Sequence, residues 1–232
     1  MGKMILYKEW LKTRWVLLAI FAVFAGALFY SLLNLAKVVE FRGAAVLWST
    51  LVAKDTVLLE ILRYLPAVAG GVLAAAQFLP ETGRKRLKLT LHLPYPEWKM
   101  ILMLVCYGIV CLTVVFALSA AICTLVMGQW IAAELTARII RTMLVWFLAG
   151  YAVYIWTAAA ILEPTWKVRA LLLVILGALL WLLFLSQVPE AYNGFLPWLC
   201  LYVAASYVLV RGSVVRFKEG CQDRGKRYQD YS

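Results

Sequence analysis

Charged residues are scarce in this chain. Asp, Glu, Lys and Arg make up 15% of its 232 residues, histidine occurs once, and the five cysteines include no Cys-x-x-Cys pair. The cysteine pattern gives no support to a disulfide framework or a thiol-redox membrane enzyme. Hydrophobic residues reach 65%. This balance excludes a soluble fold, because a soluble domain could not bury so much apolar surface.

Six long stretches lack Asp, Glu, Lys and Arg altogether. About 20 apolar residues in a helix cross the ~30 Å hydrocarbon core of a bilayer, so each stretch predicts one membrane-spanning helix, the shorter ones with help from flanking residues. We expect an all-α integral membrane protein with a single transmembrane domain over residues 1–232. The predicted spans are residues 15–36, 57–79, 100–127, 143–162, 168–188 and 195–210.

The basic residues predict how these spans are oriented. With six spans, 17 of the 23 Lys and Arg residues fall on one side, in the N-terminus, the segment 80–99, the short connection after residue 162 and the tail 211–232. The side richer in Lys and Arg is normally cytoplasmic. We therefore expect both termini in the cytoplasm. The net charge of +11 requires no nucleic-acid partner, because anionic membrane lipids attract the same basic residues.

The first fourteen residues are amphipathic when placed on a helix. Lys8, Glu9, Lys12 and Thr13 share one face, and apolar residues from Met4 to Trp15 share the other. This pattern predicts a helix over residues 1–14 that lies in the cytoplasmic interface and continues into the first span. A frayed basic terminus is the alternative.

No motif in the chain predicts catalysis, a cofactor site or a metal site. The run from Gly220 to Lys226 begins like a phosphate-binding loop, but Arg227 stands where a magnesium-binding Ser or Thr is required. His92 has no partner for a metal site or a catalytic triad. All acidic residues lie outside the six charge-free stretches, which disfavours ion-driven transport and places any energy source in a partner.

Small residues recur along one face of the second span. Ala67, Gly71 and Ala75 follow a small-x-x-x-small pattern next to Gly70. Such faces allow helices to approach closely in a membrane. The pattern predicts either contact with another subunit or packing within the chain.

The layout resembles that of ABC-2-type transporter permeases over nearly the whole chain. The likeness lies in the amphipathic basic N-terminus, the six spans, and a segment 80–99 that links the second span to the third. The letters that carry it are Gln77-Phe78, Glu81, Gly83, Arg86-Leu87, Leu93-Pro94 and Lys99. In that family the second span runs into a Glu, a short cytoplasmic helix, a Leu-Pro and a basic residue that leads into the third span.

The resemblance implies a function and a set of partners. The segment 80–99 would be a coupling helix that docks on a separate cytoplasmic ABC ATPase, with Glu81, Gly83, Arg86, Leu87 and Pro94 as its candidate residues. Glu81, at the start of the segment, is the expected cap of that helix. ATP and magnesium would bind that ATPase and not this chain, which is not expected to be an enzyme.

A second permease and membrane lipids complete the expected partners, and the expected location is the bacterial cytoplasmic (inner) membrane. Uncharged spans suit a hydrophobic or amphipathic substrate. The resemblance implies that the activity is ATP-driven export. Many family members carry a re-entrant hairpin between the last two spans, and the short connection in this chain leaves its presence open. The alternative is a non-transporting scaffold or a passive channel.

Overall fold

A computed structural model describes residues 2–53, 60–83, 97–129, 132–185 and 191–229. Every regular element in these ranges is helical. The elements are α1 (Gly2–Ala53), α2 (Glu60–Gly83), α4 (Glu97–Met127), α5 (Ala133–Leu162), α6 (Trp166–Leu183), a short 3-10 turn η1 (Asn193–Phe195) and α7 (Leu196–Gln229).

Six of these helices are long and apolar enough to cross a membrane. The chain is therefore a multi-pass membrane protein of the all-α class, as the sequence predicts. An unbroken helix is the form expected, because hydrocarbon offers no hydrogen bond to an exposed backbone group. The apolar segments are Met4–Asn34, Ile61–Thr82, Trp98–Met127, Ala133–Leu162, Trp166–Leu183 and Asn193–Phe217, mostly longer than the predicted spans.

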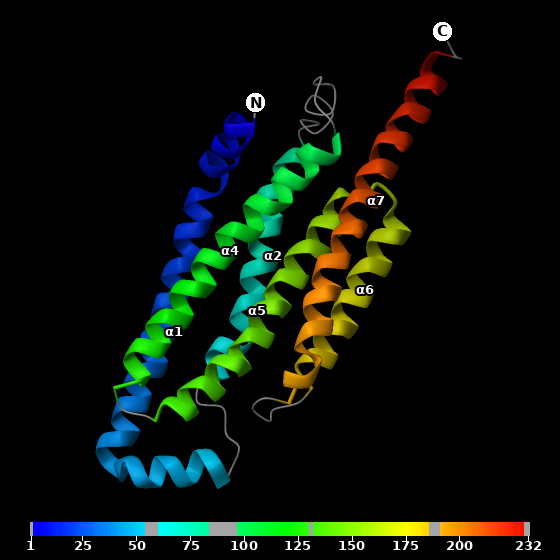
Figure 1. Cartoon of the computed structure of the whole chain (residues 1–232). Helices are drawn as coiled ribbons and strands as arrows, with labels where there is room; N and C mark the ends of the chain where they lie inside the picture. Colours follow the sequence, from blue (N-terminus) through cyan, green and yellow to red (C-terminus); the bar gives the residue numbers. More distant parts are fainter. Residues whose placement is uncertain (1, 54–59, 84–96, 130–131, 186–190, 230–232) are drawn as a thin grey trace.

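Both ends of the chain lie at the same end of the helix bundle. Figure 1 places the start of α1, the end of α2, the start of α4, the turn between α5 and α6 and the end of α7 at this end. The connection from α4 to α5 and the turn η1 lie at the opposite end. This arrangement agrees with an even number of spans. We call the two ends the N-terminal end and the far end.

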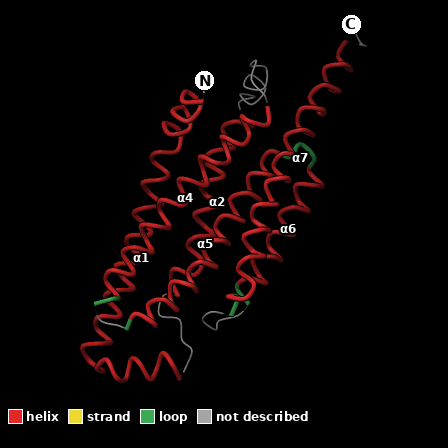
Figure 2. Tube along the Cα trace, viewed as in Figure 1, coloured by secondary structure: helices red, strands yellow, loops and turns green. Residues whose placement is uncertain are grey.

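Helix α1 extends beyond the predicted first span, which ends at residue 36. Residues 2–53 form one helix, about 78 Å long at 1.5 Å per residue, which exceeds the thickness of a bilayer. Its last third bends and runs across the far end of the bundle (Figures 1 and 2).

The first part of α1 turns its polar face toward the other helices. Glu9 and Thr13 are fully buried, whereas Met4, Tyr7 and Trp15 are exposed. The sequence placed these residues on two opposite faces correctly. The structure adds that the polar face is the inner one, because it meets polar partners on α2 and α4 that are described below.

Helix α5 is the centre of the bundle, in contact with α2, α4, α6 and α7. Its closest neighbour is α2, and the reason is the small size of two facing residues. A Cβ atom added to Gly70 of α2 would lie 2.1 Å from the backbone oxygen of Gly150 in α5, and one added to Gly71 would lie 3.5 Å from Val153. Along this face, small residues therefore serve packing within the chain. Contact of Ala67, Gly71 and Ala75 with another subunit stays a prediction.

Candidate functional site

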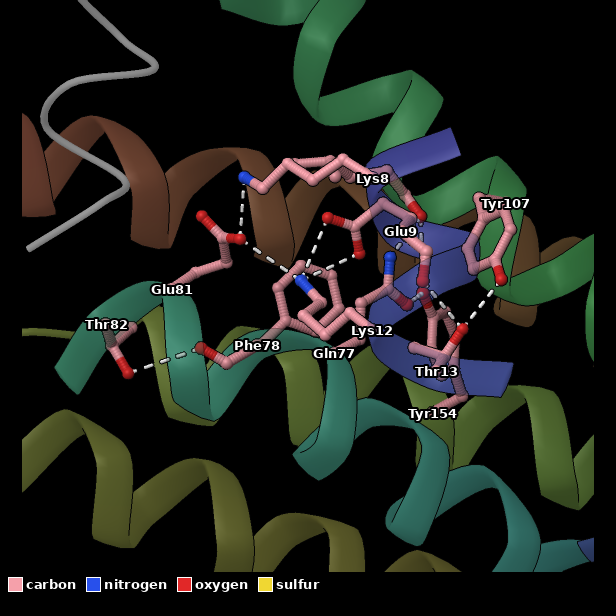
Figure 3. Close-up of polar contacts among 11 residues, drawn as sticks. Lys8, Glu9, Lys12, Thr13, Gln77, Phe78, Glu81, Thr82, Tyr107 and Tyr154 are labelled. Atoms are coloured by element: carbon pink, nitrogen blue, oxygen red, sulfur yellow. Dashed lines mark hydrogen bonds and ion pairs between the residues drawn. The ribbon is translucent and has the colours of Figure 1, made fainter. Parts of the chain in front are cut away.

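Four charged side chains from α1 and α2 meet at the N-terminal end of the bundle (Figure 3). Lys12 Nζ lies 2.9 Å from the carboxylate of Glu9 and 3.1 Å from Oε1 of Glu81, and Lys8 Nζ lies 2.9 Å from the same Glu81 oxygen. We call Lys8, Glu9, Lys12 and Glu81 the α1–α2 charge cluster. Two ammonium groups balance two carboxylates, so the cluster is neutral as a whole.

Burial makes the pairing within this cluster essential. The side chains of Glu9 and Glu81 are 0% and 4% exposed, and that of Lys12 is 15% exposed. A buried carboxylate without a partner costs several kcal/mol. Removing the basic partner from a buried ion pair therefore lowers the stability of the protein by this full amount. Lys12 is the key residue, because it contacts both carboxylates and joins α1 to α2. Lys8 is 43% exposed and closes the cluster on its solvent side.

The structure changes the interpretation of Glu81. The sequence suggests that Glu81 caps the start of a coupling helix, where a carboxylate would meet free N–H groups. Glu81 instead lies in the last turn of α2, which ends at Gly83. A negative charge is unfavourable at that end of a helix dipole, so the two lysines of α1 compensate for it. Of the other predicted coupling residues, Arg86, Leu87 and Pro94 lie outside the described ranges.

Hydrogen bonds continue the cluster into α4 and α5. The hydroxyls of Thr13 (α1) and Tyr107 (α4) are 2.7 Å apart. The Gln77 side chain, one helical turn from Glu81 on α2, donates to the backbone oxygen of Leu104 at 2.8 Å and accepts from the Tyr154 hydroxyl of α5 at 2.7 Å. The α1–α2 charge cluster and these bonds together connect four helices at one end of the bundle.

The Tyr154 hydroxyl needs a glycine beside it. A Cβ atom on Gly108 of α4 would lie 2.1 Å from the Tyr154 oxygen. Tyr154 is fully buried, and its ring lies against Phe78 with 6.3 Å between the ring centroids. Gly108 therefore allows a tyrosine hydroxyl to reach Gln77 inside an otherwise apolar core, where an unpaired hydroxyl would be costly.

A second ion pair joins the end of α5 to α7. The carboxylate of Glu163, fully buried just beyond the apolar part of α5, accepts from Arg216 Nε at 3.0 Å and from Arg216 Nη2 at 2.8 Å. Burial alone would raise the pKa of Glu163, but the hydrogen bonds and charge of Arg216 outweigh it and hold the pKa below its ordinary value. Arg169 of α6 also donates to the backbone oxygen of Glu163 at 2.7 Å.

The two ion-pair sites can hold neighbouring helices in fixed positions. Within the described ranges, no three His, Cys, Asp or Glu residues lie close enough together to hold a metal ion. Each buried carboxylate of the two sites is occupied by a basic partner on a neighbouring helix, except that Glu9 is held by Lys12 of its own helix. Such pairs fix the position of one helix against another and require no bound ligand.

Sequence reasoning found only part of this site. It named Glu81 and recognised the polar face of α1, but it missed Gln77 as a structural contact and both Tyr107 and Tyr154. The signal for the α1–α2 pairing was available in outline. A helix face that carries Lys8 and Lys12 four residues apart predicts an acidic partner. Glu81 is the acidic residue at the end of the next span.

Comparison with known proteins identifies no relative of this chain. No protein-family model, no curated protein and no solved structure matches this chain.

Proposed function

We propose that this chain is the permease subunit of an ATP-driven exporter of the ABC-2 type. A separate cytoplasmic ATPase binds ATP and magnesium, and a second permease, identical or related, completes the membrane part. The substrate is hydrophobic or amphipathic. The membrane is the bacterial cytoplasmic (inner) membrane, with both termini in the cytoplasm.

The observation that carries the proposal is the position of the α1–α2 charge cluster. Glu81 lies two residues before the end of α2, at the start of the segment 80–99 that resembles the coupling helix of the family. A push on that segment displaces the end of α2. The contacts of Glu81 with Lys8 and Lys12 pass the displacement to α1, and those of Gln77 pass it to α4 and α5. Rigid helices that shift as units are a common way to transmit such motion.

The distribution of buried charge supports a partner as the energy source. The buried acidic side chains that the structure describes are Glu9, Glu81 and Glu163. All three lie at the N-terminal end, and each is paired with Lys or Arg. An ion-driven carrier needs a carboxylate or histidine that is available to a coupling ion along the pathway. ATP hydrolysis by another subunit removes that need.

The proposed orientation is tested with reporters of membrane sidedness. A reporter placed near Lys88 or after Ser232 is expected to report the cytoplasm, and one near Asn193 the outside. The reason is the excess of basic residues at the N-terminal end. An outside signal at Lys88 contradicts both the orientation and the proposed contact with a cytoplasmic ATPase.

The ATPase partner is tested by affinity purification of this chain from native membranes. We expect an ATPase with the motif G-x-x-x-x-G-K-[ST] to be retained, encoded by a neighbouring reading frame. Leu87→Asp is the test variant, since Leu87 is the candidate apolar anchor of the coupling segment. Loss of one such anchor typically costs about 2 kcal/mol, or about 30-fold in affinity. Leu185→Asp is the control, because Leu185 is 60% exposed at the far end.

The outcomes separate a transporter subunit from the other membrane roles. Retention of the ATPase by the wild type and by Leu185→Asp, with its loss in Leu87→Asp, supports the proposal. Purification without any ATPase, together with ion currents from the reconstituted chain, supports a passive channel instead. Equal retention by both variants places the ATPase contact elsewhere and removes the coupling role from the segment 80–99.

A further inference from the structure

An apolar groove runs between α1 and α2 on the outside of the bundle. Its volume is about 510 Å³, and each helix contributes about three turns to its walls. We call it the α1–α2 groove. Twelve residues line it: Trp15, Val16, Ala19, Ile20, Val23 and Phe24 of α1, and Ile61, Tyr64, Leu65, Val68, Ala69 and Val72 of α2.

The groove opens toward the hydrocarbon of the membrane. Both walls belong to membrane-spanning segments, and several lining side chains are open to the outside, Trp15 at 69% and Val68 at 62% exposure. None of the lining residues carries a charge. Only the Trp15 indole N–H and the Tyr64 hydroxyl of the lining side chains can form hydrogen bonds, so a polar ligand would lose most of its hydration without compensation. The part of the ligand inside the groove must therefore be hydrocarbon.

Two lysines of the charge cluster lie beyond one end of the groove. Lys8 and Lys12 share a face of α1 with the lining residues Val16, Ala19 and Val23, one to two turns nearer the N-terminus. Lys8 is 43% exposed, and an ammonium group has three donors, so its contact with Glu81 leaves donors for a second acceptor. Lys12 is held inside the charge cluster and is the weaker candidate.

The start of α1 carries more positive than negative charge. Residues 2–15 contain four basic residues and one acidic residue. An excess of positive charge near a bilayer surface attracts anionic headgroups. The same excess disfavours a second copy of this chain as the occupant, because two parallel copies packed groove to groove would bring two positive ends together.

We infer that the α1–α2 groove binds one phospholipid of the surrounding bilayer, with an acyl chain between the helices and an anionic headgroup at Lys8. The site combines an apolar channel with a cation at its end, which is the distribution of polarity in an anionic phospholipid. The inference does not depend on the proposed ATPase partner. A lipid bound there would hold α1 against α2 next to the charge cluster.

The acyl-chain part is tested by blocking the groove. The purified protein is mixed in detergent micelles with phosphatidylglycerol, and native mass spectrometry measures the fraction that keeps one lipid. Val68→Trp fills the groove, and Val174→Trp is the control, since Val174 is 69% exposed on α6, outside the groove. We expect at least a tenfold loss of lipid affinity in Val68→Trp and wild-type affinity in Val174→Trp. Ala19→Phe blocks the opposite wall and replaces Val68→Trp if that variant fails to fold.

The headgroup part is tested by removing one charge. We expect Lys8→Gln to weaken phosphatidylglycerol binding about fivefold and to leave binding of the zwitterionic phosphatidylcholine unchanged. Lys167→Gln is the control, because Lys167 is an exposed lysine near the same end of the bundle and outside the groove. The expected result is a preference for the anionic lipid that Lys8→Gln loses and Lys167→Gln keeps.

Three results would overturn the inference. Equal lipid affinity in Val68→Trp and Val174→Trp shows that the lipid binds elsewhere. Equal binding of the two lipids by the wild type removes the headgroup contact. A wild-type dimer that Val68→Trp converts to monomers shows that the groove is an interface between copies. Each result leaves the ATPase experiment unaffected, so the lipid site and the proposed function fail separately.

Discussion

Helix α5 buries 72% of its most apolar stretch, whereas its neighbour α6 buries 11%. Both helices consist mainly of Leu, Ala, Val, Ile and aromatic residues, and both cross the membrane. In water, two such helices would both be driven into a core. In a membrane the lipid tails are as apolar as the side chains, so hydrophobicity does not select the buried helix.

The difference between the two helices comes from the size of their residues. Helix α5 carries small residues along its length, including Ala149, Gly150, Ala152 and the run 158–160, and all of these are buried. They allow α2 to approach so closely that Gly70 and Gly150 meet backbone to backbone. Helix α6 is rich in Leu and buries only Leu172 and Leu176. Residue size therefore decides which apolar helix becomes the centre of the bundle.

The largest loss of stability is expected where the close packing of α2 against α5 is prevented. Gly70→Ala places a Cβ atom 2.1 Å from a backbone oxygen of α5, and a backbone atom cannot rotate away. We expect a loss of about 3 kcal/mol of stability, at the upper end of the usual cost of overpacking. Thermal unfolding in detergent, followed by circular dichroism, measures the change.

The control for Gly70→Ala comes from α6. Gly177→Ala adds the same atom where nothing lies within 4 Å, and alanine favours a helix, so its melting temperature should not fall. Similar melting temperatures for the two variants would show that α2 and α5 are not packed as closely as described.

A smaller effect is expected from the buried hydrogen bond of α5. Tyr154→Phe removes the hydroxyl that donates to Gln77 and leaves a buried amide oxygen without that donor. We expect a cost of about 1 to 2 kcal/mol, measured by the same thermal unfolding. Tyr30→Phe is the control, because Tyr30 is 54% exposed on α1. If the two variants have the same melting temperature, the hydrogen bond to Gln77 contributes nothing to the stability of the bundle.

The ion pair at the end of α5 should contribute less, because one partner is half exposed. Glu163→Gln removes the charge that faces Arg216, whose side chain is 47% exposed and can be hydrated. We expect a cost of about 1 kcal/mol at pH 7. Glu134→Gln, at an exposed position in the first turn of α5, is the control and should have no effect. A loss above 3 kcal/mol would mean that Arg216 is buried and depends on the charge of Glu163.

The same pair predicts a pH dependence. The pKa of Glu163 is lowered in the folded protein, so its contribution to stability is complete above the unfolded pKa, about 4.3, and is lost as the pH falls through the lower folded value. The melting temperatures of the wild type and Glu163→Gln should therefore differ at pH 7 and converge in acid below that range. A difference that grows as the pH falls would reverse the sign of the pKa shift.

The smallest effect is expected on the outer face of α6. Val174→Ala shortens a side chain that is 69% exposed, so the change should stay within about 0.5 kcal/mol. Val153→Ala makes the same change on α5, where the side chain is buried against α2, and should cost clearly more. Thermal unfolding of the two variants compares the helices directly. Equal effects would indicate that α6 is covered by a further helix or subunit.

The number and type of the helices could be predicted from residues alone. A bilayer sets the length of an apolar helix, and hydrocarbon forbids an unpaired backbone, so six charge-free stretches translate into six spans. The exact ends could not be predicted. Helix α1 extends through Lys37 and Glu40 to Ala53, because charged residues beyond the hydrocarbon do not interrupt a helix.

The candidate site was predictable only in its parts. The polar face of α1 follows from the pattern of residues, and Glu81 was named through the family resemblance. The role expected for Glu81, a cap on the next helix, is wrong because α2 continues past it to Gly83. Gln77 and Tyr154 were out of reach, since their contact depends on the space that Gly108 leaves on a third helix.

The sequence by itself determined that this protein crosses a membrane six times with helices, because hydropathy and helix length are local properties of the chain. Only the tertiary structure decided which helix lies at the centre and which polar groups meet. Glu81 contacts Lys8 and Lys12, which are 69 or more residues away in the sequence, and Gly70 contacts Gly150, which is 80 residues away. Such contacts depend on shape and distance between helices, which no stretch of sequence contains on its own.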